Sequence, residues 1–134
     1  MLQDGGHPYR GLLYGMTARK YGEVDPRPVW GMMNDFGVAE SRMLGYWLAD
    51  APARTGNDRI LATTYVRDGR ILIALASWSD KDEVVSLSLD RDALGLGADA
   101  HAAAPAVAGL QERGPVDLSA VRVPAGQGLW VVVG

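Results

Sequence analysis

Two acidic side chains, Asp35 and Glu40, are the residues of this chain whose type and spacing best suit hydrolytic chemistry. Cleavage of a glycosidic bond uses two carboxyl groups, one protonated and one ionised, held roughly 5 to 10 Å apart. Near them lie Trp30, Tyr46 and Trp47, aromatic residues whose rings can stack on a sugar. The same pattern is also typical of acids on the solvated surface of a helix, so both interpretations stay open.

Four tryptophans are candidate carbohydrate contacts, because an indole ring at the surface can stack on a sugar ring. They are Trp30, Trp47, Trp78 and Trp130. A tryptophan in a strand can instead seal the edge of a hydrophobic core. The sequence does not distinguish these two roles, and the exposure of each ring in the folded protein decides between them.

Other kinds of active site find little support in the sequence. The chain has no cysteine, which excludes disulfides, thiolate catalysis and cysteine-ligated zinc. The histidines His7 and His101 lie among glycines and alanines, and no serine occupies a G-x-S-x-G turn. The run DKDE at 80–83 lacks the glycine and distal acid of a calcium loop, and the GLG at 95–97 opens no convincing helix for a phosphate. We therefore expect no metal and no cofactor.

Length and charge restrict the class of protein. The 134 residues suit one domain, and the net charge of −3 is spread without a basic stripe. This distribution disfavours nucleic acid and acidic membranes as partners. The sequence has no signal-peptide pattern and no run approaching the ~20 apolar residues that span a bilayer. These patterns leave the compartment undetermined.

The first part of the chain predicts a strand followed by helices. Arg10 to Met16 is an apolar run bounded by glycines, which favours a buried strand. Asp25 and Pro26 are typical of a helix N-cap and first turn. Val29, Met33 and Phe36 then recur at spacings of four and three, which places them on one helix face.

Gly37 interrupts this helical pattern, because glycine is a poor helix former. Beyond it we expect a second short helix that carries Met43 and Leu44 and ends near Gly45. A connection rich in alanine, proline and glycine follows at residues 50–58.

The stretch from Arg59 to Asp80 predicts the central β-hairpin of a sheet. Its two apolar runs flank Asp68-Gly69, a dipeptide suited to a two-residue turn with positive φ at both positions. Counting outward from the turn pairs Val66 with Ile71, Thr64 with Ile73 and Ala62 with Leu75 on one face, and Tyr65 with Leu72, Thr63 with Ala74 and Leu61 with Ala76 on the other. Since both faces are largely apolar, we expect the segment Val29 to Trp47 to cover the second face.

The remaining pattern indicates further strands. Glu83 to Asp90 alternates apolar and polar residues, as in a strand with one buried side, and residues 90–97 suggest one helical turn. The alanine-rich run at 100–109 fits either an edge strand or a loop. Leu118 to Val123 and Gly128 to Val133 are expected to form a last hairpin.

Three blocks of sequence resemble one known family. They are YRGLLYGMTARKYG from Tyr9, DPRPVWGMMNDFGVAESRMLGYW from Asp25 and ATTYVRDGRILIALASWSD from Ala62. In order and spacing they resemble the C-terminal end of bacterial glycoside hydrolase family 123-like proteins. The resemblance implies a (β/α)₈ barrel with catalytic carboxylates, followed by a C-terminal β-sandwich. Arg10 to Met16 would then be the final barrel strand, and Arg59 to Gly134 the sandwich.

We interpret the chain as mainly β, an antiparallel β-sandwich preceded by a short strand and a helical segment that are the remnant of a barrel. Residues 1–50 are assigned to the end of the barrel and residues 51–134 to the C-terminal β-sandwich domain. The rest of the barrel is absent from these residues, so no catalytic residue is carried over from the family. The start at Met1 looks like a truncated reading frame or a detached domain.

The expected function is that of a structural or accessory part of a glycoside hydrolase-like protein, not catalytic by itself. One alternative is a stand-alone carbohydrate-binding module that uses exposed tryptophans, and a second is a minimal glycosidase that uses Asp35 and Glu40. The expected partners are carbohydrate, the missing catalytic barrel or a second copy of the chain. Self-association is expected because Leu12, Leu13, Trp30 and Met32 would expose apolar surface without the barrel.

Overall fold

The computed structural model describes residues 27–48, 51–67, 69–96, 100–107 and 111–134. The predicted strand at 10–16 and the predicted helix N-cap at Asp25 lie outside these residues. In chain order the elements are α2 (Arg27–Phe36), the 3-10 helix η1 (Val38–Glu40), β1 (Arg42–Leu44), β2 (Ala53–Arg54), β3 (Ile60–Arg67), β4 (Arg70–Ser77), β5 (Glu83–Val85), β6 (Ser88–Leu89), α3 (Arg91–Leu94), β7 (Ala102–Ala104), β8 (Gly114–Pro115), β9 (Val121–Val123) and β10 (Gly128–Val133).

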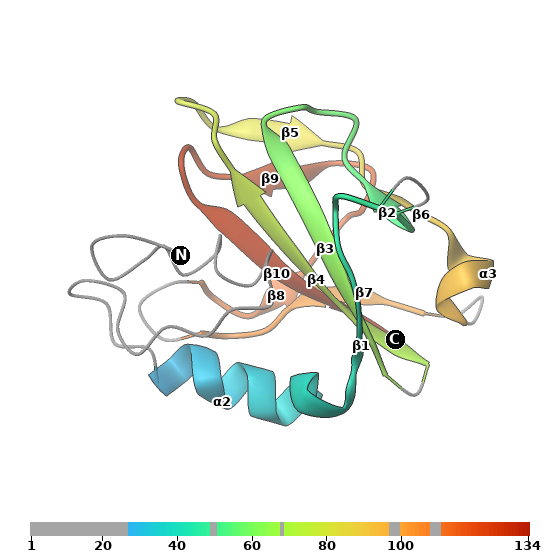
Figure 1. Cartoon of the computed structure of the whole chain (residues 1–134). Helices are drawn as coiled ribbons and strands as arrows, with labels where there is room; N and C mark the ends of the chain where they lie inside the picture. Colours follow the sequence, from blue (N-terminus) through green and yellow to red (C-terminus); the bar gives the residue numbers. More distant parts are fainter. Residues whose placement is uncertain (1–26, 49–50, 68, 97–99, 108–110) are drawn as a thin grey trace.

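Six strands form one antiparallel sheet, here called the main sheet, in the order β1-β3-β4-β10-β7-β8. Two short antiparallel pairs, β2 with β6 and β5 with β9, lie over one face of the main sheet, and α2 lies over the other (Figure 1). The predicted class, mainly β with antiparallel sheets after a helical segment, is confirmed. The division into residues 1–50 and 51–134 stays a prediction. β1, which lies before residue 51, pairs within the main sheet with β3, which lies after it.

The β3–β4 hairpin has the predicted register. Every predicted pair is present, from Val66 with Ile71 next to the turn to Leu61 with Ala76 far from it. Gly69 has a φ of 77°, the positive value that its turn position was expected to need. The short Asp-Gly connection thus fixes which side chains share a face of the sheet.

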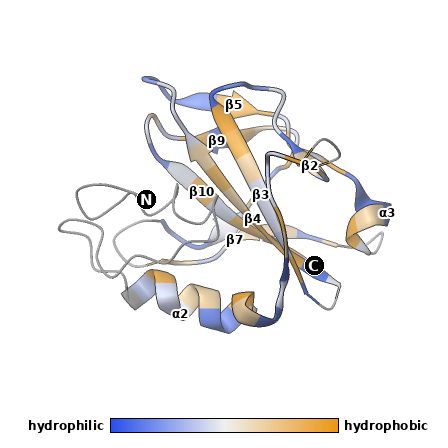
Figure 2. Ribbon diagram, in the orientation of Figure 1, coloured by the Kyte–Doolittle hydropathy of each residue, from blue (hydrophilic) through white to orange (hydrophobic). Residues whose placement is uncertain are grey.

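α2 covers the second face of this hairpin, as the two-sided apolar pattern predicts. Val29, Met32 and Phe36 are buried in one cluster with Tyr65 and Leu72. Apolar and polar residues alternate along the α2 ribbon, which is typical of a helix with one buried face (Figure 2). Met32 is only 6% exposed, so it is part of this core and adds almost no apolar surface, contrary to the expectation from the sequence.

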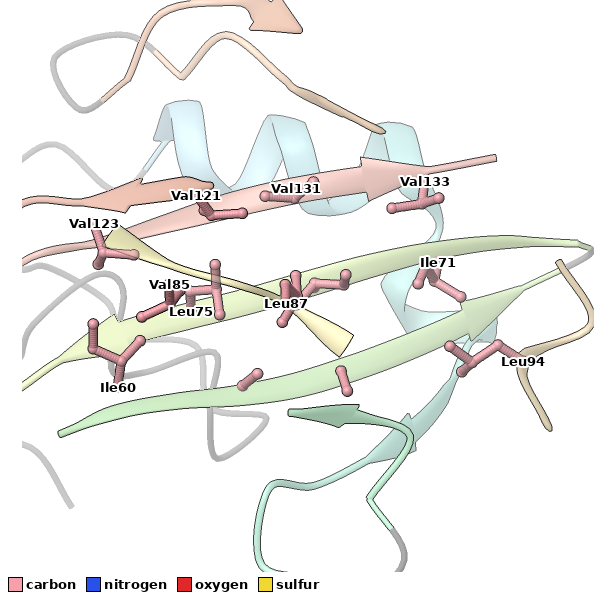
Figure 3. Close-up of a cluster of buried hydrophobic side chains, with 13 residues drawn as sticks. Ile60, Ile71, Leu75, Val85, Leu87, Leu94, Val121, Val123, Val131 and Val133 are labelled. Carbon is pink, nitrogen blue, oxygen red and sulfur yellow. The ribbon is translucent and has the colours of Figure 1, made fainter. Parts of the chain in front are cut away.

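The opposite face of the main sheet carries a second core. Ile71, Leu75 and Val131 lie in it, and Val85 and Val121 from the β5–β9 pair pack against them (Figure 3). All five side chains are at most 5% exposed. Because full burial of one aliphatic side chain stabilises a fold by about 1.5 to 3 kcal/mol, this layer is a main source of stability.

The segment after Gly37 is not the second α-helix that the sequence predicts. One 3-10 turn is followed by the strand β1, in which Met43 pairs with Tyr65 and Leu44 pairs with Thr64. Pairing with β1 satisfies backbone N–H and C=O groups along β3, and buried groups of this kind almost always have a partner. That tertiary contact outweighs a weak local helical preference.

The predicted last hairpin is also wrong. β9 pairs with β5 in the short layer, whereas β10 pairs with β4 on one side and β7 on the other. Both edges of β10 are therefore paired with strands other than β9, which precedes it in the chain. Residues 124–127 therefore connect two layers.

The stretch from Glu83 to Asp90 keeps its predicted alternation but is not one strand. Val85 and Leu87 are buried, whereas Ser86 and Ser88 are exposed. β5 pairs with β9 and β6 pairs with β2, so the stretch belongs to two different sheets. The alanine-rich run contributes β7, which pairs with both β10 and β8 and is therefore not an edge strand.

The predicted helical turn near residue 90 is confirmed as α3. Asp90 caps it, because its Oδ1 accepts a hydrogen bond from Ala93 N at 3.1 Å. Gly95 ends it in the left-handed region, with a φ of 68°.

Two arginines of the hairpin hold the C-terminal end of α2. Arg67 Nη1 and Arg70 Nη2 donate hydrogen bonds to the Phe36 carbonyl oxygen at 3.2 and 3.3 Å. The Arg70 guanidinium also lies over the Phe36 ring, 5.2 Å from its centroid. Positive groups at this end suit the partial negative charge of a helix C-terminus. Gly37 follows with a φ of 88°, so α2 ends where the chain turns toward β1.

Thr64→Val is expected to raise the free energy of unfolding by about 1 kcal/mol, because it removes a buried hydroxyl without changing the shape of the side chain. Within the described residues, Thr64 Oγ1 is buried and has no hydrogen-bond partner. The neighbouring buried Thr63 is a matched control, since its Oγ1 accepts a hydrogen bond from Tyr46 N at 3.3 Å. Urea unfolding of both variants measures the change, and Thr63→Val should destabilise. Equal destabilisation by both would contradict the assignment.

Candidate functional site

Trp30 lines an apolar hollow between α2 on one side and the strands β1 and β3 on the other. The hollow has a volume of about 620 Å³. Its lining includes Trp30, Met33, Asn34, Ser41, Met43 and Tyr65. Met43 and Tyr65 are paired across β1 and β3, so the sheet register places them together. Trp30 is 37% exposed, which leaves part of its ring available for contact with another molecule.

Trp47 is more exposed, at 55%, yet its ring has close neighbours. It forms an edge-to-face contact with Tyr46, with ring centroids 5.3 Å apart and an interplanar angle of 81°. A side chain at Gly45 would place its Cβ 2.4 Å from the Trp47 ring, so the ring lies directly on the glycine. The absence of a side chain at Gly45 therefore makes this position of Trp47 possible.

Trp78 lies just beyond β4 in a backbone that is closely fixed. Trp78 N donates to Arg59 O at 2.8 Å. Its neighbours Ser77 and Ser79 are buried, and Ser79 Oγ donates to Glu83 Oε2 at 2.7 Å. Trp78 itself is 40% exposed, so the turn presents a large aromatic side chain at the surface.

Asp82 ties this turn to the connection between β9 and β10. Its Oδ1 accepts a hydrogen bond from Ala125 N at 2.8 Å, and its Oδ2 accepts one from Arg122 Nη2 at 3.0 Å. These contacts, the Ala125 bond first and the Arg122 bond second, lower the pKa of the exposed Asp82 carboxyl below its usual value. The acidic run at 80–83 thus has structural partners.

Trp130 differs from the other three tryptophans because it is fully buried in the core beneath α2. A ring with no exposed surface cannot stack on a sugar. Trp30, Trp47 and Trp78 are therefore the tryptophans whose side chains are exposed to solvent. The sequence could not separate Trp130 from them, because strand position alone does not reveal which face another element covers.

The candidate acids Asp35 and Glu40 are both exposed. Asp35 lines a hollow of about 330 Å³ together with Arg70 and Arg113. Glu40 lies in η1, beyond the turn at Gly37, and does not line this hollow. A carboxyl pair that cleaves a glycosidic bond must face the same bond, and this hollow contains only one of the two acids.

The described residues contain no group of three or more His, Cys, Asp or Glu side chains placed to hold a metal ion. They also contain no helix that is long and apolar enough to cross a membrane.

Comparison with known proteins gives one match. A family model described as "Glycoside hydrolase 123, C-terminal domain" matches residues 25–134, a range that includes every described element from α2 to β10. The chain belongs to this family. No curated protein and no solved structure matches the chain.

Membership in the glycoside hydrolase 123 C-terminal domain family confirms the resemblance inferred from the three sequence blocks. Two features of this domain were missed by the sequence interpretation. The hollow beside Asp35 contains Arg70 and Arg113, and the side chain of Gln111 bonds to the backbone of Trp130. No local signal marks either feature, because the residues come together only when distant strands pair.

Proposed function

We propose that this chain is a non-catalytic β-domain that accompanies a glycoside hydrolase catalytic domain as a structural or accessory part. The match of residues 25–134 to the C-terminal domain model supports the proposal most directly. The separation of Asp35 from Glu40 by the turn at Gly37 supports it further, because the hollow that Asp35 lines does not include Glu40 among its described lining residues.

The surface that we propose for a partner domain is the apolar hollow beside α2. Met33, Val38 and Met43 contribute to its lining, and Trp30 adds a partly exposed indole ring. Buried aromatic and methionine side chains are enriched in protein interfaces. Either of two partners would cover this surface: a catalytic barrel or a second copy of the chain. Sedimentation velocity over a concentration series tests the second possibility, and a strict monomer would exclude it.

The absence of catalysis is tested with the purified chain and a panel of aryl glycosides. We expect no turnover above that of a preparation from cells without the gene. Asp35→Asn and Glu40→Gln variants identify the source of any signal, since contaminating enzymes remain active in both preparations. Turnover that is lost in both variants, while both stay folded, would establish the minimal glycosidase instead.

A carbohydrate-binding module remains the second candidate function, because Trp30, Trp47 and Trp78 all have exposed surface. Titration with oligosaccharides, followed by tryptophan fluorescence, tests it. A module would show saturable binding that weakens in one of the variants Trp30→Ala, Trp47→Ala or Trp78→Ala. The structural role predicts no saturable change with any of the sugars.

A further inference from the structure

Two arginines and a histidine line a hollow that lies apart from the tryptophans. This hollow has a volume of about 730 Å³ and is formed by α3, β7, β8 and the chain after β8. Arg91, His101 and Arg113 all line it. They come from three separate segments, so only the folded chain brings them together. The volume is within the range of roughly 300 to 1,000 Å³ that is usual for small-molecule sites.

These side chains have no partner of their own within the described part of the chain. Neither a hydrogen bond nor an ion pair involves the side chains of Arg91, His101 and Arg113 there. A guanidinium group carries five donors and stays charged at any physiological pH. The hollow therefore offers donors and positive charge that an outside molecule can use.

The acid in the lining does not neutralise the arginines. Asp117 Oδ1 accepts hydrogen bonds from Ser119 N at 2.9 Å and from Ser119 Oγ at 2.6 Å. The carboxylate is thus engaged within its own turn. The described lining contains two arginines and one aspartate, so its formal charge is positive, whereas the whole chain has a net charge of −3.

Hydrogen bonds fix the backbone at or near each of these three residues. Arg91 O accepts from Leu96 N at 3.0 Å, and His101 O accepts from Gly134 N at 3.1 Å. Arg113 lies two residues after Gln111, whose side chain is hydrogen-bonded to the backbone of Pro105 and Trp130, and directly before Gly114 of β8. A fixed backbone limits the conformational entropy that is lost when the side chains close on a ligand.

We propose that this hollow binds a small molecule through an oxyanion, the carboxylate or sulfate of an acidic saccharide or a free inorganic anion. Planar guanidinium groups match the geometry of such anions and donate two hydrogen bonds to one group. Arg91 and Arg113 hold the anion from two sides, and His101 donates a further hydrogen bond. The site is independent of sugar stacking on the tryptophans and of any glycosidase activity.

The test is an NMR titration of the full chain at pH 7 and low ionic strength with sulfate, glucuronate and glucose. Sulfate reports on free anions, glucuronate on acidic saccharides, and glucose is the uncharged match of glucuronate. We expect saturable shifts at residues 100–103 and 113–119 with glucuronate or sulfate, and none with glucose. Preference for glucuronate over sulfate identifies the saccharide, and the reverse preference identifies the free anion.

Charge-neutral variants establish the residues that bind. Arg113→Gln and Arg91→Gln should each weaken binding about threefold or more, as expected for loss of one partly solvated charge contact. Arg59→Gln is the matched control, because Arg59 is also exposed but does not line this hollow. Both lining arginines are exposed, so neither replacement disturbs a core. The proposal is overturned by the absence of saturable shifts, by equal shifts with glucose, or by equal weakening in Arg59→Gln.

Discussion

Gln111→Leu is expected to lower the free energy of unfolding by about 3 kcal/mol, because it removes three hydrogen bonds to the main chain at once. Gln111 Nε2 donates to Pro105 O at 2.8 Å and to Trp130 O at 3.0 Å. Gln111 Oε1 accepts from Trp130 N at 3.0 Å. Leucine occupies a similar volume but can make none of these bonds.

The physical reason lies in the edge of β10. The N–H and C=O groups of one strand residue point to the same side, and at Trp130 both point to the carboxamide of Gln111. β7 pairs with β10 only at Val132 and Val133. The Gln111 side chain therefore takes the place of a strand next to Trp130. Each buried backbone group left without this hydrogen-bond partner lowers the free energy of unfolding by about 1 to 3 kcal/mol.

Urea unfolding, monitored by tryptophan fluorescence and circular dichroism, measures this loss. Glu112→Leu is the control, since Glu112 is exposed and adjacent in sequence, and we expect its effect to stay within about 0.5 kcal/mol. Gln111→Glu keeps the acceptor but lacks the Nε2 donors, so it should also destabilise strongly. A loss below about 1 kcal/mol in Gln111→Leu would show that water replaces the carboxamide.

Gly37→Ala is expected to destabilise the fold by about 2 kcal/mol through two separate effects. Gly37 has a φ of 88°, a left-handed conformation that is unfavourable for a residue with a Cβ. The new Cβ would also lie 1.5 Å from Arg67 Nη1, so the guanidinium must move. That movement breaks the Arg67 contact with the Phe36 carbonyl oxygen at the end of α2.

Gly31→Ala provides the matched control in the same helix. Gly31 lies within α2, is exposed, and has no atom within 4 Å of an added Cβ. Alanine should therefore stabilise α2 by up to about 1 kcal/mol. Thermal and urea unfolding of both variants measure the two effects. Opposite signs are expected, and a stabilised Gly37→Ala protein would refute the assigned role of the Arg67 contact.

Local sequence signals predicted the elements whose partners are close in the chain. Asp68-Gly69 set the register of β3 with β4, because a two-residue turn leaves only one way to pair the strands. The spacing of the apolar residues in α2 showed its buried face, and Gly37 marked its end. The helical turn expected over residues 90–97 is α3, and its caps at Asp90 and Gly95 also join residues only a few positions apart.

The candidate site was predicted only in part. The sequence identified the residue types, tryptophan for stacking and acids for hydrolysis, but not which of them reach a common surface. Trp130 is buried because it lies in β10 in the core beneath α2, and Asp35 of α2 shares a hollow with Arg70 of β4 and with Arg113, the residue before β8. Such groupings depend on contacts between segments that are far apart in the sequence.

The sequence by itself determined the antiparallel hairpin, the helix that covers it and the family to which the chain belongs. Tertiary structure alone decided that Met43 joins a strand, that β9 and β10 enter different sheets, and that Gln111 replaces a strand beside Trp130. The physical reason is that buried backbone N–H and C=O groups need hydrogen-bond partners. In a sheet these partners come from segments far apart in the chain, so a local sequence pattern does not reveal them.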